Sequence, residues 1–400
     1  MDQRAAKVGH RKSRKGCSKC KIRRVKGDAD VFLVPESVAD EFSLPESRAR
    51  RLMEHRLMQN YILHLSEPLP MSPSAEWNAL WQKQLPPLAL QHDNLLYALL
   101  AMSATSLLGA GEDESRKGDE HGSGDSSGSS SETSSGNSGS GSNVERKELF
   151  TVRQAYLIAA MGEQRRMVQS LTLASADAVC LSSLLMLINA FAMLGERVVQ
   201  PYTPPTEWLQ LGRGSGAVVW LSVEAIQQSG EADRSVMCTI ANAPPQFGLD
   251  ESYFDASNRE QFGALLATEA TTASASEPSD PDDETTRLAY EQTLAYVGSI
   301  YKAIRRREPV YVISRRVQGF TMVVPPRFVD LVAASRPRAL VVLAYFFAAV
   351  VQLSGVWWLG EGAGAGRNCI ARRELRGIRS VLPDEWTGLM VWPLDIAGLM

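Results

Sequence analysis

The apolar positions of this chain recur mainly with the helical period, and sustained apolar–polar alternation is almost absent. The segment Glu46–Leu65 carries an amphipathic pattern, with Leu52, Arg56, Gln59 and Leu63 beside Met53 and Leu57 on one stripe and Arg48, Arg50, Arg51 and Glu54 toward solvent. Segment 94–108 is apolar nearly all round, which is typical of a central helix. This segment ends a helical stretch at 77–108 that Pro86-Pro87 breaks, and further helices are expected at 148–168, 175–194, 287–306, 326–334 and 337–353. The best strand candidate, Pro309–Ser314, is short, so the pattern predicts an all-α fold.

Two polar stretches interrupt this helical pattern. Residues 109–145 are mostly Gly, Ser, Asp and Glu, and such a segment cannot bury enough apolar surface to offset its ordering entropy. We expect it to be a disordered insertion between two helices of one domain, and residues 268–286 to be a second loop. The sequence therefore predicts a basic arm at 1–30, a connector at 31–45, and a helical regulatory domain at 46–400.

The longest apolar runs do not fit a membrane span. The run from Ala339 to Val351 is too short to cross a bilayer, and the longer run from 178 to 194 is interrupted by Ser182, Ser183 and Asn189. The apolar fraction of 44% is enough for a sizeable core. Both runs are therefore predicted to be buried helices, and neither a transmembrane segment nor a secretory signal is expected.

Charge is distributed unevenly, although the net charge is only -3. Residues 1–26 contain eleven Lys or Arg against one acid, Asp2, so the rest of the chain is acidic on balance. A basic arm on an acidic body indicates an anionic partner such as nucleic acid or a membrane surface. A nuclear import signal or a solvated tail would give the same composition.

Only two of the five cysteines, Cys17 and Cys20, lie close in sequence, which is unlike a secreted disulfide framework. Their Cys-x2-Cys spacing suits two ligands of one tetrahedral metal ion. A redox pair has the same spacing, although no βαβ pattern surrounds it here. The basic run after Cys20 favours the metal-binding interpretation.

The segment Cys17-Ser-Lys-Cys20-Lys-Ile-Arg23-Arg24-Val-Lys26 resembles the first half of the fungal binuclear zinc cluster, in which six cysteines hold two zinc ions. The resemblance implies zinc ligation by Cys17 and Cys20, and binding of double-stranded DNA at CGG-type half-sites. It implies base contacts by Arg23 and Arg24, since arginine can reach guanine O6 and N7. Phosphate contacts would come from the other basic side chains of the arm, Arg11, Lys12, Lys15, Lys19, Lys21 and Lys26.

This segment departs from the family pattern after Lys26. Gly27 stands where the third cysteine is expected, and no further cysteine occurs before Cys180. Two thiolates cannot hold two zinc ions with four ligands each, and His10 lies outside the motif. Without metal so short a peptide has no core, so residues 1–40 are expected to be disordered or marginally helical. A gene-model or splicing error, or a real loss, would explain the missing half.

The remainder of the chain resembles the regulatory domain of the sterol-uptake-control branch of these regulators. The likeness rests on three stretches: 80–104, 182–214, and 325–393 with its Trp357-Trp358 pair and Leu382-Pro-Asp-Glu-Trp386. The resemblance implies a helical domain that binds a sterol in an apolar pocket. Candidate lining residues are Phe191, Met193, Trp208, Tyr345, Phe346, Trp357 and Trp358, for which plain core packing is the alternative.

No motif points to an enzyme. Gly212-Arg-Gly214-Ser-Gly-Ala217 fits a loose dinucleotide-binding pattern but follows no convincing strand, and the five histidines form no metal-binding pair. The sequence thus favours a nuclear, sequence-specific regulator of RNA polymerase II genes, which could shuttle from the cytoplasm and form a homodimer, for example through Glu46–Leu65. The alternative is a helical ligand- or partner-binding regulatory protein that has lost DNA binding.

Overall fold

The computed structural model describes residues 47–66, 78–120, 138–242, 251–267, 283–360 and 370–400, which all lie in one compact unit, Phe42–Met400. Within these ranges every regular element is a helix, so the predicted all-α fold is confirmed. The α-helices are α3 (Arg48–Asn60), α5 (Leu85–Ala89), α6 (Asp93–Glu120), α7 (Ser138–Gln169), α8 (Leu173–Met193), α9 (Thr206–Ser229), α10 (Val236–Asn242), α11 (Gly263–Ala267), α12 (Glu284–Arg305), α13 (Val310–Val323), α14 (Pro326–Ala333), α15 (Pro337–Val350), α16 (Ile370–Val381) and α17 (Thr387–Ile396). Two π-helical turns, Tyr61–Leu65 and Leu80–Gln84, adjoin α3 and α5.

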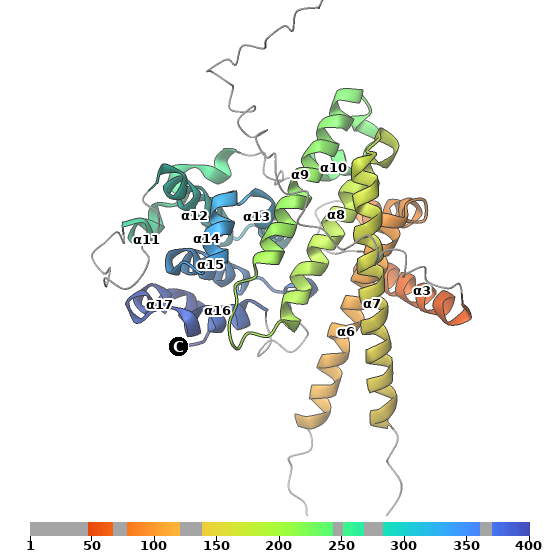
Figure 1. Cartoon of the computed structure of the whole chain (residues 1–400), viewed down its shortest axis with the longest axis horizontal. Coiled ribbons are helices and arrows are strands. Elements are labelled where there is room, and N and C mark those ends of the chain that lie inside the picture. The colour runs from red at the N-terminus through yellow and green to blue at the C-terminus, as the bar shows by residue number, and fades with distance from the viewer. Residues whose placement is uncertain (1–46, 67–77, 121–137, 243–250, 268–282, 361–369) are drawn as a thin grey trace, which may run out of the picture. The chain divides into compact units, whose positions relative to one another are not determined.

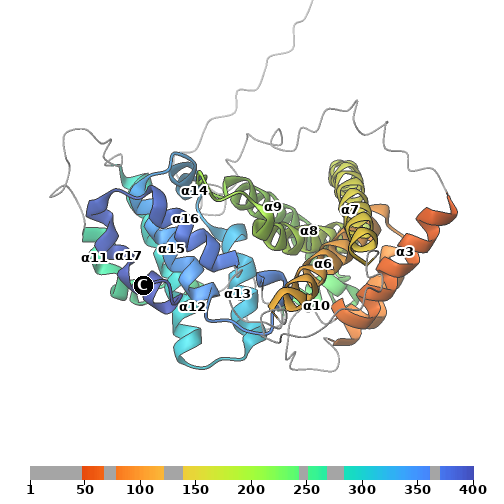
Figure 2. The ribbon, with the colours of Figure 1, turned by 90° about the horizontal axis from the view of Figure 1, so that it is seen from below.

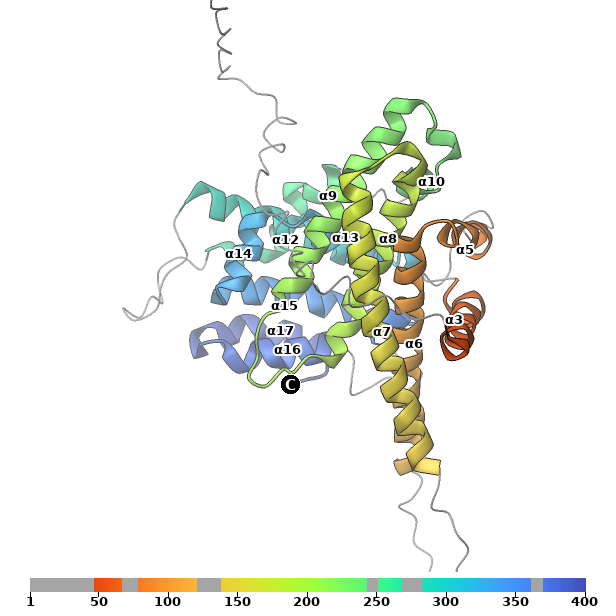
Figure 3. The same ribbon diagram turned by 45° about the vertical axis from the view of Figure 1, so that its right-hand side comes forward.

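The order of the helices in space largely follows their order in the chain (Figure 1). Helix α6 packs against α7 and α8, α8 packs against α9, and α9 packs against α13. Helix α12 contacts α13, α14 and α15, and α15 packs against α16 and α17. Figure 2 shows the two ends of this succession, with α3, α6 and α7 on one side and α15 to α17 on the other. The long pair of α6 and α7 lies side by side in both Figure 1 and Figure 3.

Helix α8 is the apolar centre of this arrangement. It begins with a capping box, in which Thr172 and Ser175 exchange hydrogen bonds that satisfy the first turn. The stretch Leu173–Glu196 is long enough to cross a membrane, and an 18-residue window within it has a mean hydropathy of 2.0, but 78% of that window is buried inside the fold. Helices α14 and α15 pass the same test only when taken together across a 108° bend. Their burial agrees with the prediction that the runs at 178–194 and 339–351 are core helices.

The strand predicted at Pro309–Ser314 is wrong, because these residues begin helix α13. Pro309 is the N-cap residue, with its backbone outside helical geometry, and Val310 starts the helix. Val312, Ile313 and Val317 are buried by the neighbouring helices. The β-branched residues favour a strand only weakly, and burial of one helical face outweighs that local preference.

The helices that flank the first polar stretch are longer than expected. Helix α6 continues to Glu120 and α7 begins at Ser138, so both ends of the expected insertion 109–145 are helical. A helix extends at low cost once it has nucleated, and the packing of α6 on α7 supplies the nucleus. Residues 121–137 lie outside the described residues. So do residues 268–282 of the second expected loop, and α12 begins directly after its N-cap Asp283.

The predicted stripe on α3 coincides only in part with the buried face: Leu57 is buried and Met53 packs against the core, whereas Leu52 and Leu63 do not. Leu52 is 54% exposed and Leu63 is 63% exposed, whereas Leu57, Tyr61 and Leu65 are buried. Asn60 on the buried face donates to Ser103 Oγ of α6 at 2.9 Å. A polar residue on the inner face, followed by a π-helical turn with its different periodicity, explains why a regular 3.6-residue pattern misplaced part of the stripe.

The glycine-rich segment at 212–217 lies inside helix α9 and serves close packing. A Cβ atom at Gly212 would lie 2.0 Å from Thr321 Oγ1 of α13, and one at Gly216 would lie 2.8 Å from the Met322 carbonyl oxygen. Glycine at these two positions, one turn apart, therefore lets α9 and α13 approach more closely than any side chain would allow. Close helix packing therefore explains the glycines of the 212–217 segment, and no bound dinucleotide is needed to account for them.

Candidate ligand-binding site

The residues predicted to bind metal and DNA, Cys17 and Cys20 with the basic side chains from Arg11 to Lys26, lie outside the described residues. Among the residues that the structure does describe, no group of three or more His, Cys, Asp or Glu side chains is placed to hold a metal ion. Cys180 and Cys238 are both buried and free. Burial raises the pKa of the Cys180 thiol to about 12, so this cysteine is inert at neutral pH.

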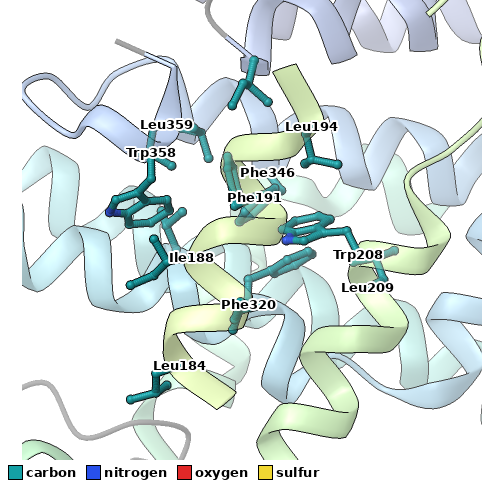
Figure 4. Packing of buried hydrophobic residues seen from close by; sticks show 14 of the residues in the cluster. Leu184, Ile188, Phe191, Leu194, Trp208, Leu209, Phe320, Phe346, Trp358 and Leu359 are labelled. Carbon is teal, nitrogen blue, oxygen red and sulfur yellow. The ribbon is translucent and has the colours of Figure 1, made fainter. Parts of the chain in front are cut away.

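Four of the seven predicted lining residues meet in one cluster of aromatic rings (Figure 4). Phe191 makes edge-to-face contacts with Trp208 at 5.2 Å and with Trp358 at 5.4 Å between ring centroids. Trp208 also lies 5.9 Å from Phe346, which stacks on Phe320 at 4.0 Å. All five rings are buried, and they fill this region with contacts to one another. Phe191, Phe346 and Trp358 are thus placed in the core.

The other three residues lie in different surroundings. Tyr345 stacks on Trp392 of α17 at 5.4 Å, at the C-terminal end of the helical succession. Trp357 is half-buried and begins a short 3-10 turn, Trp357–Leu359, after α15. Met193 is half-buried at the end of α8. The seven candidates therefore do not surround a common space.

A cleft of about 600 Å³ lies between α7, α8 and the first turns of α9. The connector from α8 to α9, residues 194–205, closes one side of it. Of the predicted residues only Met193 and Trp208 belong to its lining. The full set of lining residues is Gln154, Leu157, Ile158, Met161, Met186, Asn189, Ala190, Met193, Leu194, Arg197, Thr203, Pro204, Pro205, Thr206, Glu207, Trp208 and Leu211.

The lining of this cleft is mainly apolar and includes three methionines. Methionine side chains are flexible and polarisable, so they adapt to ligands of irregular shape. Two of the lining residues, Asn189 and Trp208, carry buried hydrogen-bond donors. Asn189 is 1% exposed, accepts a hydrogen bond from Thr105 on Oδ1, and has only the Met193 thioether sulfur, at 3.7 Å from Nδ2, as an acceptor. The indole N–H of Trp208 is buried with no acceptor among the described residues.

Ion pairs hold the connector that walls the cleft. Arg153 of α7 is fully buried and binds Glu196 through both guanidinium Nη atoms. Arg197 donates from Nη1 to Glu374 Oε1 of α16 at 2.8 Å and also donates to the Thr203 carbonyl oxygen. The Tyr202 hydroxyl donates to Glu374 Oε2 at 2.9 Å. The connector is therefore fixed to α7 on one side and to α16 on the other.

Glu374 is the centre of this network and is itself buried. Desolvation raises the pKa of its carboxyl group, while Arg197 and the Tyr202 hydroxyl act in the opposite direction. Tyr202 reaches Glu374 because residue 377 is glycine: a Cβ there would lie 2.1 Å from the Tyr202 ring. Sequence reasoning missed this network, since its members are 172 to 177 residues apart.

The lining of the cleft carries few ionisable or nucleophilic side chains. No cysteine, serine or histidine is among its lining residues, its one carboxylate, Glu207, is exposed, and Arg197 is already paired. An apolar cleft between helices is the kind of site in which small-molecule ligands bind in proteins.

Comparison with known proteins finds similarity to fungal transcription factors. The chain is 28% identical over 365 residues, 85% of each chain, to the Zn(2)-C6 fungal-type transcription factor afumD of Aspergillus fumigatus. It is also 28% identical over 376 residues, 91% of this chain and 67% of the other, to a Zn(2)-C6 fungal-type transcription factor of Gibberella zeae. No protein-family profile matches. The chain is thus homologous to fungal Zn(2)-C6 transcription factors over most of its length, and its relatives are regulators, not enzymes.

Proposed function

We propose that this protein regulates transcription by binding double-stranded DNA through residues 1–30. The similarity to two named transcription factors over 85% and 91% of the chain carries this proposal. Two residue patterns support it further: the Cys17-x2-Cys20 pair, and the directly following arginines Arg23 and Arg24. In this proposal the two arginines read guanine edges, and the surrounding lysines hold phosphates. The site of action is the nucleus.

Zinc is part of the proposal only as far as the ligands allow. Cys17 and Cys20 supply two of the four ligands that one zinc ion needs, and the third expected ligand position is Gly27. A single zinc ion would need further ligands from a second chain, from His10 or from water. We therefore assign the DNA-contacting role to the basic side chains and derive no step that requires the metal.

A gel-shift titration with a CGG-containing duplex and a random duplex of equal length tests DNA binding. We expect tighter binding to the CGG duplex, and Arg23→Ala should remove that preference. Lys12→Ala is the matched control for charge: it should weaken binding to both duplexes equally and flatten the salt dependence. Metal analysis of the same preparation gives the zinc content per chain. Equal binding of both duplexes by the unmodified protein would contradict sequence readout.

A second candidate function is a helical regulatory protein that binds a ligand or partner and has lost DNA binding. The absence of any cysteine between Cys20 and Cys180 favours this candidate. The same titration separates the two: no shift of either duplex at low salt supports this second function. In either case the helical body has the same regulatory role.

We further propose that the helical body senses a flat, apolar ligand of the sterol type. The apolar cleft supports a small-molecule ligand, and the likeness of 80–104, 182–214 and 325–393 to sterol-responsive regulators supports its class. Ergosterol should raise the melting temperature of the purified chain, because a ligand that binds only the folded state stabilises it. An unchanged melting temperature at saturating ergosterol would count against a sterol. Light scattering of the same sample tests the proposed homodimer.

A further inference from the structure

We infer that the cleft between α7, α8 and α9 binds a neutral, mainly apolar small molecule that carries a hydrogen-bond acceptor, and that Asn189 donates to this acceptor. This inference deepens the proposed ligand-sensing function and rests on it. It names the location of the site, the charge of the ligand and the group that orients it.

The dimensions of the cleft suit a small molecule. Helix α7 contributes Gln154, Leu157, Ile158 and Met161, and α8 contributes Met186, Asn189, Ala190 and Met193. Each set has the spacing i, i+3, i+4, i+7 of a single helix face, which spans about 10 Å at 1.5 Å per residue. A volume of about 600 Å³ lies in the range of small-molecule sites. The closing connector and the two-turn length leave no room for a partner helix of several turns.

The partial exposure of apolar side chains in the cleft indicates that a ligand covers them. Leu157, Ile158 and Met161 of α7 line the cleft and are only half-buried. Met193 and Leu211, which also line the cleft, are half-buried as well. Filling the hollow with an apolar molecule would remove this surface from water, which is the main source of affinity in such sites.

The buried amide of Asn189 defines the polar part of the ligand. Its oxygen is used by Thr105, whereas its Nδ2 has only the thioether sulfur of Met193, a weak acceptor, at 3.7 Å. A buried amide donor without a strong acceptor is costly, and an incoming hydroxyl or carbonyl oxygen would satisfy it.

The charges around the cleft favour a neutral ligand. Arg197 is the cation of the lining, and Glu374 neutralises it from α16 at 2.8 Å. Glu207 is exposed at the rim. An anionic ligand would meet no unpaired cation in this lining, and a cationic ligand would meet only the solvent-exposed carboxylate of Glu207. Either ligand would lose its hydration on entering the apolar cleft, which disfavours its binding.

Nile red, a neutral flat dye with one carbonyl acceptor, is the first probe for the full-length protein. We expect a saturable, one-site rise in its fluorescence. Ala190→Phe places a ring inside the cleft and should weaken binding at least tenfold. Ala159→Phe is the matched control, because Ala159 has the same intermediate burial on α7 but does not line the cleft. Circular dichroism of both variants confirms that they fold.

Competition by a matched pair of steroids tests the donor. 5α-Androstan-3-one and 5α-androstane differ only in the ketone oxygen, and the ketone should displace Nile red with roughly fivefold higher affinity, the value of one ordinary hydrogen bond. Asn189→Leu should bring this ratio to about one, while binding of androstane itself is retained. Equal affinities of the two steroids for the unmodified protein would overturn the assignment of Asn189.

Two further results would overturn the site itself: no saturable Nile red binding by the unmodified protein, or equal binding by the Ala190→Phe variant and the unmodified protein. The gel shift on DNA is measured separately on the same preparation. Ligand binding without a DNA shift would sustain this inference and refute DNA binding, and a DNA shift without ligand binding would do the reverse.

Discussion

Replacing Arg197 by methionine should lower the free energy of unfolding by about 2–3 kcal/mol at neutral pH. Arg197 is the cation that neutralises Glu374, whose carboxylate is 0% exposed and lies 2.8 Å from Arg197 Nη1. Methionine keeps the length of the side chain and its apolar packing but removes the charge. In this variant the connector 194–205 loses the ion pair to Glu374 of α16, while the Tyr202 hydroxyl still donates to Glu374 and Arg373 of α16 still donates to the carbonyl oxygen of residue 197.

The magnitude follows from the burial of the pair. Removing one partner of a fully buried ion pair costs about 3–5 kcal/mol, because the other charge is left without compensation. Arg197 is 24% exposed, so water replaces it in part, and the Tyr202 hydroxyl still donates to Glu374 at 2.9 Å. Both effects reduce the expected loss to about 2–3 kcal/mol.

A double-mutant cycle measures the coupling directly. Urea unfolding, followed by circular dichroism, gives the stability of the unmodified chain, Arg197→Met, Glu374→Met and the double variant. We expect the double variant to be more stable than the sum of the two single losses predicts, by about 1–2 kcal/mol, since it leaves no uncompensated charge. Additive losses would refute the claim that these two residues form one buried unit.

The pH dependence of the same variants gives a second test. Burial raises the pKa of Glu374 above the ordinary value of 4.5, so the unfolded chain releases this proton first as pH rises. Between the ordinary pKa and the raised pKa the folded state binds more protons than the unfolded state. The contribution of Glu374 to stability therefore falls as pH rises through this range. Arg197 lowers the pKa of Glu374 in the folded state, so removing Arg197 widens the pH range over which the folded and unfolded states differ in protonation. The stability difference between the unmodified chain and Arg197→Met should therefore grow from about pH 4.5 to neutral pH.

Three further predictions concern the helical body. Gly212→Ala should destabilise the protein by about 1–2 kcal/mol, since the clash with Thr321 outweighs the gain in helix propensity of up to about 1 kcal/mol; Gly162→Ala, with no atom within 4 Å of its Cβ, should be neutral or stabilising in the same melting assay. Asp177→Ala should cost about 1–2 kcal/mol, because Asp177 of α8 accepts three hydrogen bonds from the start of α10; urea unfolding measures the loss, and an unchanged midpoint would contradict the capping role. Cys180 should resist alkylation by iodoacetamide in the native protein at neutral pH, owing to its burial and a pKa of about 12, and should react once urea unfolds the chain; peptide mapping by mass spectrometry detects either result.

The fold class and the positions of the main helices could be predicted because they depend on local periodicity. The apolar runs at 94–108, 175–194 and 337–353 lie in α6, α8 and α15. Prolines gave reliable starts: Pro326 and Pro337 each begin a helix, where the missing backbone N–H costs nothing. The exceptions have local causes as well, since the β-branched residues after Pro309 and the π-helical turn after α3 both depart from an ordinary helical pattern.

The candidate cleft could not be predicted to the same extent. The sequence predicted aromatic lining residues, but Phe191 packs against Trp358, and Phe346 packs against Trp208 and Phe320, in the core. The half-exposed lining residues, such as Leu157 and Met161, look like ordinary helix-face residues in the sequence. Only the position of α9 and its connector relative to α7 and α8 leaves a hollow between them.

The sequence by itself determined that this chain is helical, that its first 26 residues form a strongly basic arm with the Cys17-x2-Cys20 pair, and that no enzyme motif was recognised. These properties are local, because they depend on neighbouring residues and their spacing. The tertiary structure decided which face of each helix is buried, where the cleft lies, and that Arg197 meets a carboxylate 177 residues away. Such contacts depend on the packing of the whole helical succession, and no local pattern of residues specifies them.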